Sequence, residues 1–506
     1  MHWPRPRLAA LLAALAAPLP AAADAGIPKA RQDELRHLLL HDCGSCHGLT
    51  MRGGLGRPLL PETLAGRSDD ALAEVILQGI RGTAMPPWRD ELTAGEALWM
   101  VRDCAGETCM STRRDVLGGL LAAGTLTGGA APAAVVERGT GDLGIVVERA
   151  SGSVQIVETT GRSALGRITG LGDLSHASAV FSRDGRYAFV FGRDGGLSKL
   201  DLLRGVLAQR IMQAGNSIGG AISDDGRLVA VGNYEPGGVR IFDAETLAPV
   251  AEIPAAHGPD GAARSKVVGL ADLPGRGFAF SLFDAGEIWI ATIPREGAPE
   301  VRRFRDVGRQ PYDGFVTPDG RHYIAGLFGE DGLARIDLWQ PELGVRRVLD
   351  GYGRGEEPLP VFKMPHLRGW AAAGELLFLP AIGRHELLVV DRRDWTERGR
   401  VATHGQPVFA VARPGGRQVW VNFAHPRNDV VQVVDTQSLS VIHAFTLGRG
   451  VMHLEFTPRG EQVWISVRDT NRVEVFDTQS LARIASLPAE SPSGIFLTAR
   501  AQRIGF

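Results

Sequence analysis

The chain has 506 residues, of which 44% are hydrophobic and 22% charged, and its formal net charge is −2. This length exceeds one comfortable hydrophobic core and indicates two or more domains, while the composition excludes wholesale disorder. The near-neutral charge gives no electrostatic reason to expect nucleic acid as a partner.

The first 23 residues have the pattern of a secretory signal peptide. Arg5 and Arg7 form a basic region, an apolar run follows over 8–19, and the alanines at 21–23 provide a cleavage site. The apolar run is too short to span a bilayer, which needs about 20 residues. We therefore expect residues 1–23 to be removed and the mature protein to be periplasmic.

The motif CGSCH is the attachment pattern of a c-type haem. Cys43 and Cys46 lie on one helical turn, where each thiol can add to a haem vinyl group, and His47 then supplies the proximal iron ligand. A redox C-x-x-C pair or a structural disulfide is the alternative, which the adjacent histidine and the export signal disfavour. Met85, in the loop GTAMPPW, is predicted as the sixth ligand, because a thioether opposite an imidazole suits electron transfer.

Apolar residues recur at helical spacing around these ligands. The pattern predicts a small all-α domain over residues 24–109, which resembles class I monohaem cytochrome c. His41 is expected to be a surface residue of the first helix and not a ligand. The three predicted helices cover 31–43, 68–80 and 93–104.

Two further cysteines close this domain. Cys104 and Cys109 have the spacing C-x4-C, and in an oxidising compartment they are expected to form a disulfide. Free or metal-binding thiols are the alternative.

A second export-like segment lies inside the chain, over residues 110–138. It starts at Met110, continues with Arg113 and Arg114 and an apolar stretch, and resembles a twin-arginine signal. We interpret it as the join between two formerly separate exported proteins. It either persists as a linker or is cleaved to release the two halves.

From residue 139 to the end, a turn sequence followed by a β-rich pair is repeated. The 65 glycines favour many tight turns, and the turn glycines recur every 41 to 54 residues. Four short strands per repeat are typical of a propeller blade, so residues 139–506 predict an all-β, eight-bladed β-propeller. The first copy lacks its inner strand, and the C-terminal SPSGIFLTA supplies one, so we expect the last strand to close the ring. A solenoid or a sandwich is the alternative that this closing strand disfavours.

The start of each innermost strand opens on the central channel of such a propeller. Imidazole, amine and phenol groups stand at these starts and converge on one mouth. The mouth is therefore the default binding site, although the fold alone does not define a function. The residues at these starts are His176, Ser217, Lys266, Tyr312, His366, Val408 and Met452.

Three segments of the repeat region resemble the NirF family of haem d1 biosynthesis proteins. They read LSHASAVFSRDGRYAFVFGRDGGLSKLDLL, AVGNYEPGGVRIFDAETL and GRQPYDGFVTPDGRHYIAGLFGEDGLARIDLW. That family is related to the d1 domain of cytochrome cd1 nitrite reductase and to the NirN dihydro-haem d1 dehydrogenases. The resemblance covers residues 110–506, and the preceding domain is similar to NirC, a small cytochrome of the same pathway. The chain therefore resembles a NirC–NirF-type fusion.

The resemblance implies a periplasmic propeller that binds haem d1 or its precursor for denitrification. His176 matches the propeller histidine of the family and is expected to ligate the d1 iron, and His366 loosely matches a distal histidine of the reductase. Where the reductase has its other distal histidine, this chain has Tyr312. Paired distal imidazoles protonate nitrite, whereas a phenol with a pKa of about 10 does not readily do so, which disfavours nitrite reduction.

The carboxylates of a tetrapyrrole need cations, preferably guanidinium groups. Arg193 is the first candidate and, with His176, forms the candidate catalytic pair; Lys266, Arg309 and Arg368 follow. Tyr234 either stacks on the macrocycle or packs a blade edge. The other histidines of the propeller, among them His322, His443 and His453, are interpreted as structural or surface residues.

The leading hypothesis is a haem d1 maturation factor in which a covalent haem c transfers single electrons while the propeller holds a d1-type tetrapyrrole. Whether it is an oxidoreductase acting on a haem d1 precursor stays open. The alternatives are a non-catalytic chaperone that delivers haem d1 and, less favoured, a cd1-type nitrite reductase; a general protein scaffold is the weakest. The implied partners are the tetrapyrrole, cytochrome cd1 nitrite reductase, other haem d1 assembly proteins and small electron carriers.

Overall fold

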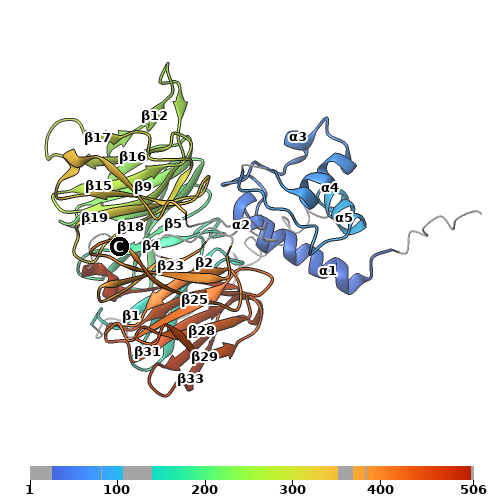
Figure 1. Cartoon of the computed structure of the whole chain (residues 1–506). Helices are drawn as coiled ribbons and strands as arrows, with labels where there is room; N and C mark the ends of the chain where they lie inside the picture. The colour runs from blue at the N-terminus through green and yellow to red at the C-terminus, as the bar shows by residue number, and fades with distance from the viewer. Residues whose placement is uncertain (1–25, 81–82, 106–138, 352–368, 382–383, 503–506) are drawn as a thin grey trace, which may run out of the picture.

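The computed structural model describes residues 26–80, 83–105, 139–351, 369–381 and 384–502 (Figure 1). A small helical domain precedes a larger domain of β-strands, as the sequence predicts. No helix in these ranges is long and apolar enough to cross a membrane. The predicted signal peptide and linker, together with Cys109, His366 and Arg368, lie outside the described residues, so the disulfide of Cys104 stays a prediction.

The helical domain contains helices in all three segments whose periodicity predicts them. The first helix, α1 (Lys29–Leu38), continues through the π-helical turn η1 (Leu39–Cys43) into α2 (Gly44–His47). A short α3 (Pro61–Leu64) precedes α4 (Asp69–Gln78) and α5 (Ala94–Ala105). At the start of α4 the Ala71 amide donates to the Ser68 hydroxyl, an N-cap contact that serine favours. Leu35, Ala97 and Met100 are almost fully buried in the core that these helices share.

The larger domain forms, within the described residues, eight four-stranded antiparallel sheets, which confirms the predicted β-propeller. The first blade joins β34 (Pro492–Leu497), β1 (Leu143–Glu148), β2 (Ser153–Glu158) and β3 (Ser163–Ile168). The second holds β4 (Ser178–Phe181), β5 (Tyr187–Phe191), β6 (Gly196–Asp201) and β7 (Val206–Met212), and the third β8 (Asn216–Ile222), β9 (Leu228–Glu235), β10 (Val239–Asp243) and β11 (Pro249–Ile253). A hairpin of β12 (Ala256–His257) and β13 (Ala263–Arg264) follows.

The remaining blades continue in chain order. The fourth holds β14 (Val267–Leu273), β15 (Gly277–Leu282), β16 (Glu287–Thr292) and β17 (Glu300–Phe304), and the fifth β18 (Pro311–Val316), β19 (His322–Leu327), β20 (Leu333–Asp337) and β21 (Val345–Val348), with the 3-10 turn η3 (Pro341–Leu343) before β21. The sixth holds β22 (Ala371–Ala373), β23 (Leu376–Pro380), β24 (Glu386–Asp391) and β25 (Glu397–Ala402). The seventh holds β26 (Pro407–Ala412), β27 (Gln418–Phe423), β28 (Val430–Asp435) and β29 (Ser440–Thr446), and the eighth β30 (Val451–Phe456), β31 (Gln462–Val467), β32 (Arg472–Asp477) and β33 (Arg483–Pro488), with 3-10 turns η4 (Arg468–Thr470) and η5 (Thr498–Gln502).

The repeated turns connect the innermost strand of a blade to its neighbour. In the second blade the Gly185 amide donates to the Ser182 carbonyl oxygen over 2.8 Å. Gly185 has a φ of +69°, a backbone conformation that glycine adopts without steric cost. This requirement explains why a glycine recurs once in each repeat.

The ring closes where the C-terminal strand joins the first blade. β34 pairs with β1, with Ile145 opposite Phe496, as the unpartnered last strand predicts. The Thr498 hydroxyl then donates to the Leu143 carbonyl oxygen over 2.8 Å. The innermost strands of successive blades contact one another around the axis and so surround a central channel.

The helical domain lies against one face of the propeller, with α2 toward it (Figure 1). The Asn216 side-chain amide donates to the Gly53 carbonyl oxygen over 3.3 Å, and the Thr50 hydroxyl lies 3.4 Å from a carboxylate oxygen of Asp173. Leu55 and Ala84 pack against an aromatic cluster of the propeller. Asn216 starts the innermost strand β8, and Asp173 lies in the segment that leads into β4, so the helical domain covers the mouth to which the sequence assigns the site.

Candidate functional site

The C-x-x-C-H motif lies at the end of the first helical stretch, where Cys43 ends η1 and Cys46 and His47 belong to α2. His47 Nδ1 lies 2.6 Å from the Arg57 carbonyl oxygen. A carbonyl only accepts, so Nδ1–H donates and Nε2 is left to bind iron. Burial lowers the pKa of His47, against the raising effect of the Arg57 hydrogen bond, and this favours the neutral, ligating imidazole.

The backbone of Gly56 lies against the His47 ring. A Cβ at this position would stand 2.6 Å from the imidazole Cε1, so only glycine allows this approach. The ring orientation is therefore set from two sides, by the Arg57 carbonyl and by the Gly56 backbone.

Met85 lies in the predicted loop between α4 and α5. Its carbonyl oxygen accepts the Ile80 amide hydrogen over 3.0 Å, and its own amide donates to the Thr83 hydroxyl over 3.2 Å. Its side chain packs against the core of the helical domain, as does that of Cys43. A c-type haem needs two thiols for covalent attachment and, as iron ligands, an imidazole and a thioether. The two thiols on one turn, the oriented imidazole and the loop thioether of this domain fit that group.

A cavity of about 840 Å³ runs along the propeller axis between the innermost strands. This volume falls within the range of about 300–1,000 Å³ that is usual for ligand sites. Three of the predicted mouth residues line it, namely His176, Tyr312 and Met452. The hydroxyls of Ser175 and Ser178, which flank His176, are buried and have no partner within the described parts of the chain. The cavity therefore offers an imidazole and unused hydroxyls to a bound molecule.

Tyr312 meets Tyr234 at the mouth of this cavity. Their hydroxyl oxygens are 3.1 Å apart, and the Tyr312 ring lies edge-on to Phe283 at 5.9 Å. Burial raises the pKa of both phenols, and that of Tyr312 stands well above its ordinary value, so both stay protonated. The sequence predicts that Tyr234 either stacks on the macrocycle or packs a blade edge. The structure favours packing, because its buried ring lies in the aromatic cluster beneath the helical domain.

Arg193 reaches residues 43–57, which comprise the C-x-x-C-H motif with α2 and the loop after it and are called here the haem-attachment loop, and it does not line the cavity. Its Nη2 donates to the Ser45 carbonyl oxygen over 3.2 Å, and its guanidinium carbon lies 5.2 Å from the centre of the Tyr234 ring. A Cβ on Gly54 would stand 2.8 Å from Nη2, so the loop contacts this guanidinium closely. Only 4% of Arg193 is exposed, yet Nε and Nη1 have no partner among the described residues.

Arg149 is a second buried arginine at the same face, and the sequence does not predict it. Arg149, in the turn between β1 and β2, is 3% exposed, and its Nε and Nη2 have no partner in the described ranges. Burial lowers its pKa to about 10, and Arg468 adds to this effect, whereas Asp42 and Asp173 oppose it. Nothing in the local sequence ERASGS distinguishes this arginine from a surface residue.

The other predicted cations are paired elsewhere. Lys266 Nζ lies 3.1 Å from an oxygen of Asp284, and Arg309 Nε lies 3.6 Å from an oxygen of Glu330. Neither residue lines the cavity. His366 and Arg368 lie outside the described residues, and their predicted roles stay predictions.

His453 has the structural contacts expected of it, because its Nδ1 accepts the Ile495 amide hydrogen over 3.2 Å and its ring is edge-on to Phe409 at 5.0 Å; it also lines the cavity. One histidine of the helical domain differs from its interpretation as a surface residue. His41 is buried, with 8% exposed, and not a surface residue. Its pKa is lowered to about 2, by burial first and then by Arg468 and Arg149 of the propeller. The surface prediction is wrong because the helix face that carries His41 is covered by the second domain.

Charged groups complete the contact between the domains. His37 Nε2 lies 3.1 Å from an oxygen of Asp469, and Arg468 Nε lies 2.5 Å from the other oxygen. Arg468 Nη2 also lies 4.0 Å from a carboxylate oxygen of Asp42, the residue before Cys43 of the C-x-x-C-H motif. Burial acts to raise the pKa of Asp469, but hydrogen bonds from His37 and Arg468 hold it below its usual value.

Comparison with known proteins assigns both parts of the chain. Residues 138–501 match the family described as Cytochrome D1 heme domain, and residues 30–102 match Cytochrome C oxidase, cbb3-type, subunit III. The chain is 61% identical to Protein NirF of Pseudomonas aeruginosa over 368 residues, which cover 73% of this chain and 94% of that protein. It is 58% identical to Cytochrome c55X of Paracoccus denitrificans over 95 residues, 19% of this chain and 88% of that protein.

A solved structure resembles the chain through both domains. The structure described as dihydro-heme d1 dehydrogenase NirN in complex with DHE superimposes with a TM-score of 0.65 at 26% sequence identity. The match covers 92% of this chain and 99% of that structure. The expected resemblance to a cytochrome fused to a d1-type propeller is thereby confirmed.

Proposed function

The chain belongs to the Cytochrome D1 heme domain family, and on this premise we propose that it is a periplasmic haem d1 maturation protein of denitrification. Its propeller binds a d1-type tetrapyrrole, haem d1 or its precursor, at the mouth of the central cavity. Its helical domain carries a covalent haem c, which supplies one-electron transfer when bound.

One observation carries this proposal: Arg149 and Arg193 are buried at the contact with the helical domain with unused N–H groups, and His176 lines the central cavity. Buried N–H groups are normally satisfied, so the unused ones of Arg149 and Arg193 favour an anionic ligand group. Guanidinium forks suit carboxylates, which a tetrapyrrole carries on its rim. His176 in the cavity lining is suited to ligate the iron of such a group. His366 is proposed as a further imidazole of the same site.

Tyr312 argues against nitrite reduction. Its hydroxyl is hydrogen-bonded to Tyr234, and burial raises its pKa well above the ordinary value. A phenol in this state keeps its proton at neutral pH and is a poor proton donor to a bound substrate. It is suited to hold a ligand by a hydrogen bond, as a maturation role requires; cytochrome cd1 nitrite reductase is proposed as the downstream partner.

Ligand titration tests the proposal. The full chain with its haem c, mixed with haem d1 or dihydro-haem d1, should shift the absorption bands of the added macrocycle. His176→Ala should change the ligand-sensitive bands, and Arg149→Met should weaken binding about tenfold, the loss of one charge-assisted contact. His443→Ala, on the exposed outer strand β29, should behave as the wild type. Identical spectra for the wild type and His176→Ala would refute the assigned ligand.

Mass analysis of the macrocycle separates an enzyme from a carrier. A dihydro-haem d1 that loses two hydrogens during incubation with the protein and two equivalents of a one-electron acceptor has given up two electrons and two protons, and this result supports an oxidoreductase. An unchanged mass together with tight binding supports the chaperone.

A further inference from the structure

A small polar pocket lies on the propeller face opposite the helical domain, between the fifth and sixth blades. Its volume is about 290 Å³, and it is lined by the start of β19, the end of β20, β21 and the turn after β24. His322 begins β19 and Asp337 ends β20, whereas the helical domain contacts the other ends of the strands. The pocket is therefore separate from the haem site.

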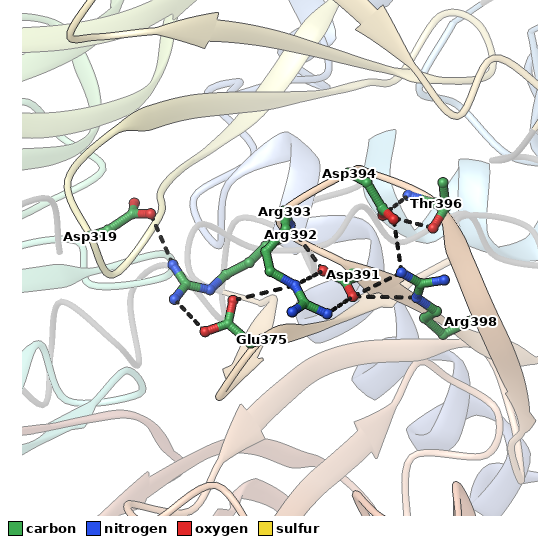
Figure 2. A network of polar contacts seen from close by, with 8 residues as sticks. All are labelled: Asp319, Glu375, Asp391, Arg392, Arg393, Asp394, Thr396 and Arg398. Carbon is green, nitrogen blue, oxygen red and sulfur yellow. Dashed lines mark hydrogen bonds and ion pairs between the residues drawn. The ribbon is translucent and has the colours of Figure 1, made fainter.

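Four arginines line this pocket, and two of them have their charge offset within the protein. Arg321 donates to one oxygen of Asp337 through Nε at 2.9 Å and Nη2 at 2.8 Å. Arg393 donates to both oxygens of Asp391, at 3.0 and 2.7 Å, within a wider ionic network (Figure 2). The second oxygen of Asp337 accepts the Trp339 and Gln340 amide hydrogens, so each oxygen of this carboxylate already accepts two hydrogen bonds.

The other two arginines face each other without such a partner. Arg335 of β20 and Arg346 of β21 are directly opposed in the strand register. Neither has an ion pair to a carboxylate among the residues that the structure describes. Like charges at opposed positions destabilise a sheet. Burial and the charge of Arg346 together lower the pKa of Arg335, whose guanidinium stacks over Trp395 at 5.1 Å.

We propose that this pocket is a binding site for a small multivalent oxyanion, held between Arg335 and Arg346. Two guanidinium forks suit phosphate or paired carboxylate groups, and the anion would offset the repulsion within the arginine pair. The volume is near the lower limit of ligand sites, about 300 Å³, so a small anion fits and a tetrapyrrole does not. The buried imidazole of His322 also lines the pocket, with Nε2 3.8 Å from a carboxylate oxygen of Asp337.

Calorimetric titration of the full chain tests this site without any tetrapyrrole. The probes are inorganic pyrophosphate, which represents phosphate ligands, and citrate, which represents carboxylate ligands. At least one is expected to bind and to raise the melting temperature, and the stronger of the two identifies the class. Arg346→Met should lose at least tenfold in affinity and, because it removes a repulsion, should melt at a higher temperature than the wild type without anion.

Arg347→Met is the matched control. Arg347 is the next residue of the same strand, and it has its own carboxylate partner, Glu330, at 2.8 Å. This variant should bind the anion like the wild type. Absence of binding by either probe in the wild type, or equal affinity of wild type and Arg346→Met, would overturn the proposal. The melting temperature of Arg346→Met establishes that a loss of binding does not result from unfolding.

Discussion

The contact between Gly56 and His47 depends on the absence of a side chain at position 56. The imidazole predicted to bind iron rests on the glycine backbone, and the Arg57 carbonyl fixes which nitrogen would face the metal. The C-x-x-C-H motif predicts which residue is the ligand. The orientation of that ligand depends on the loop with Gly56 and Arg57, which follows the motif and has no recognisable sequence pattern.

Gly56→Ala is expected to displace the His47 ring. The added Cβ would stand 2.6 Å from Cε1, and overpacking of this kind costs roughly 1–3 kcal/mol. The unfolding free energy of the helical domain and the low-spin haem spectrum are the measurements. Gly95→Ala, where a Cβ meets nothing within 4 Å, should instead stabilise α5 by about 1 kcal/mol or less. Equal effects of the two variants would contradict the proposed ring support.

Where chemistry depends on local spacing, the sequence is enough to predict individual residues. Cys43, Cys46 and His47 are predicted because haem attachment needs two thiols on one helical turn and an adjacent imidazole. Arg149 and His41 are not, because their burial arises only when the two domains meet. A residue that is functional through tertiary contact leaves no periodic signal in its own segment.

At the scale of elements, the closing strand β34 joins the two ends of the propeller. It lies between β1 and the innermost strand of the eighth blade, so its side chains pack in two blades. The repeat period and the surplus C-terminal strand predict this closure, because the first blade lacks its innermost strand and the C-terminal strand has no other blade to join. The sequence does not predict the π-helical turn η1, because its hydrogen-bond pattern leaves no mark in the apolar periodicity.

Ile495→Ala in β34 should destabilise the whole propeller. Ile495 is fully buried, and removing such a side chain typically costs about 2–5 kcal/mol. Chemical denaturation followed by circular dichroism measures the difference. Ile484→Ala in β33, where 39% of the residue is exposed, is the control and should cost no more than about 1 kcal/mol. A similar cost at both positions would mean that closure adds nothing to stability.

At the scale of the whole molecule, charged groups contribute to the contact between the two domains. His37, Arg468 and Asp469 form one group at this contact, and Arg193 and Asn216 form another around the haem-attachment loop. Because many of these contacts are ionic, the association of the domains should respond to pH and salt.

Acid should separate the domains. The pKa of Asp469 in the folded protein lies below its ordinary value of 3.8. Its stabilisation of the domain contact is therefore fully present above pH 3.8 and is lost as the pH falls through the lower, folded pKa. The radius of gyration from X-ray scattering is expected to increase below about pH 4. Asp469→Asn should be expanded already at pH 7 and show little further change.

Asp435→Asn provides the matched control for this titration. The pKa of Asp435 is also lowered, to about 2, mainly by the Ser438 amide, although burial opposes the shift. It is the last residue of β28, where it accepts the Ser438 amide hydrogen, and among the described residues it makes no contact with the helical domain. This variant should expand with acid like the wild type; an acid response of Asp469→Asn that matches it would exclude Asp469 as the controlling group.

The helical domain over the cavity mouth has a further consequence, which concerns concentration. Because cytochrome and propeller belong to one chain, each encounters the other at a high effective concentration, and a modest affinity keeps the mouth covered. The contact can therefore break to admit a macrocycle and form again at a rate that does not depend on how many copies of the protein the cell contains. Two separate proteins would need a tighter contact to remain together, and a tighter contact would open more slowly.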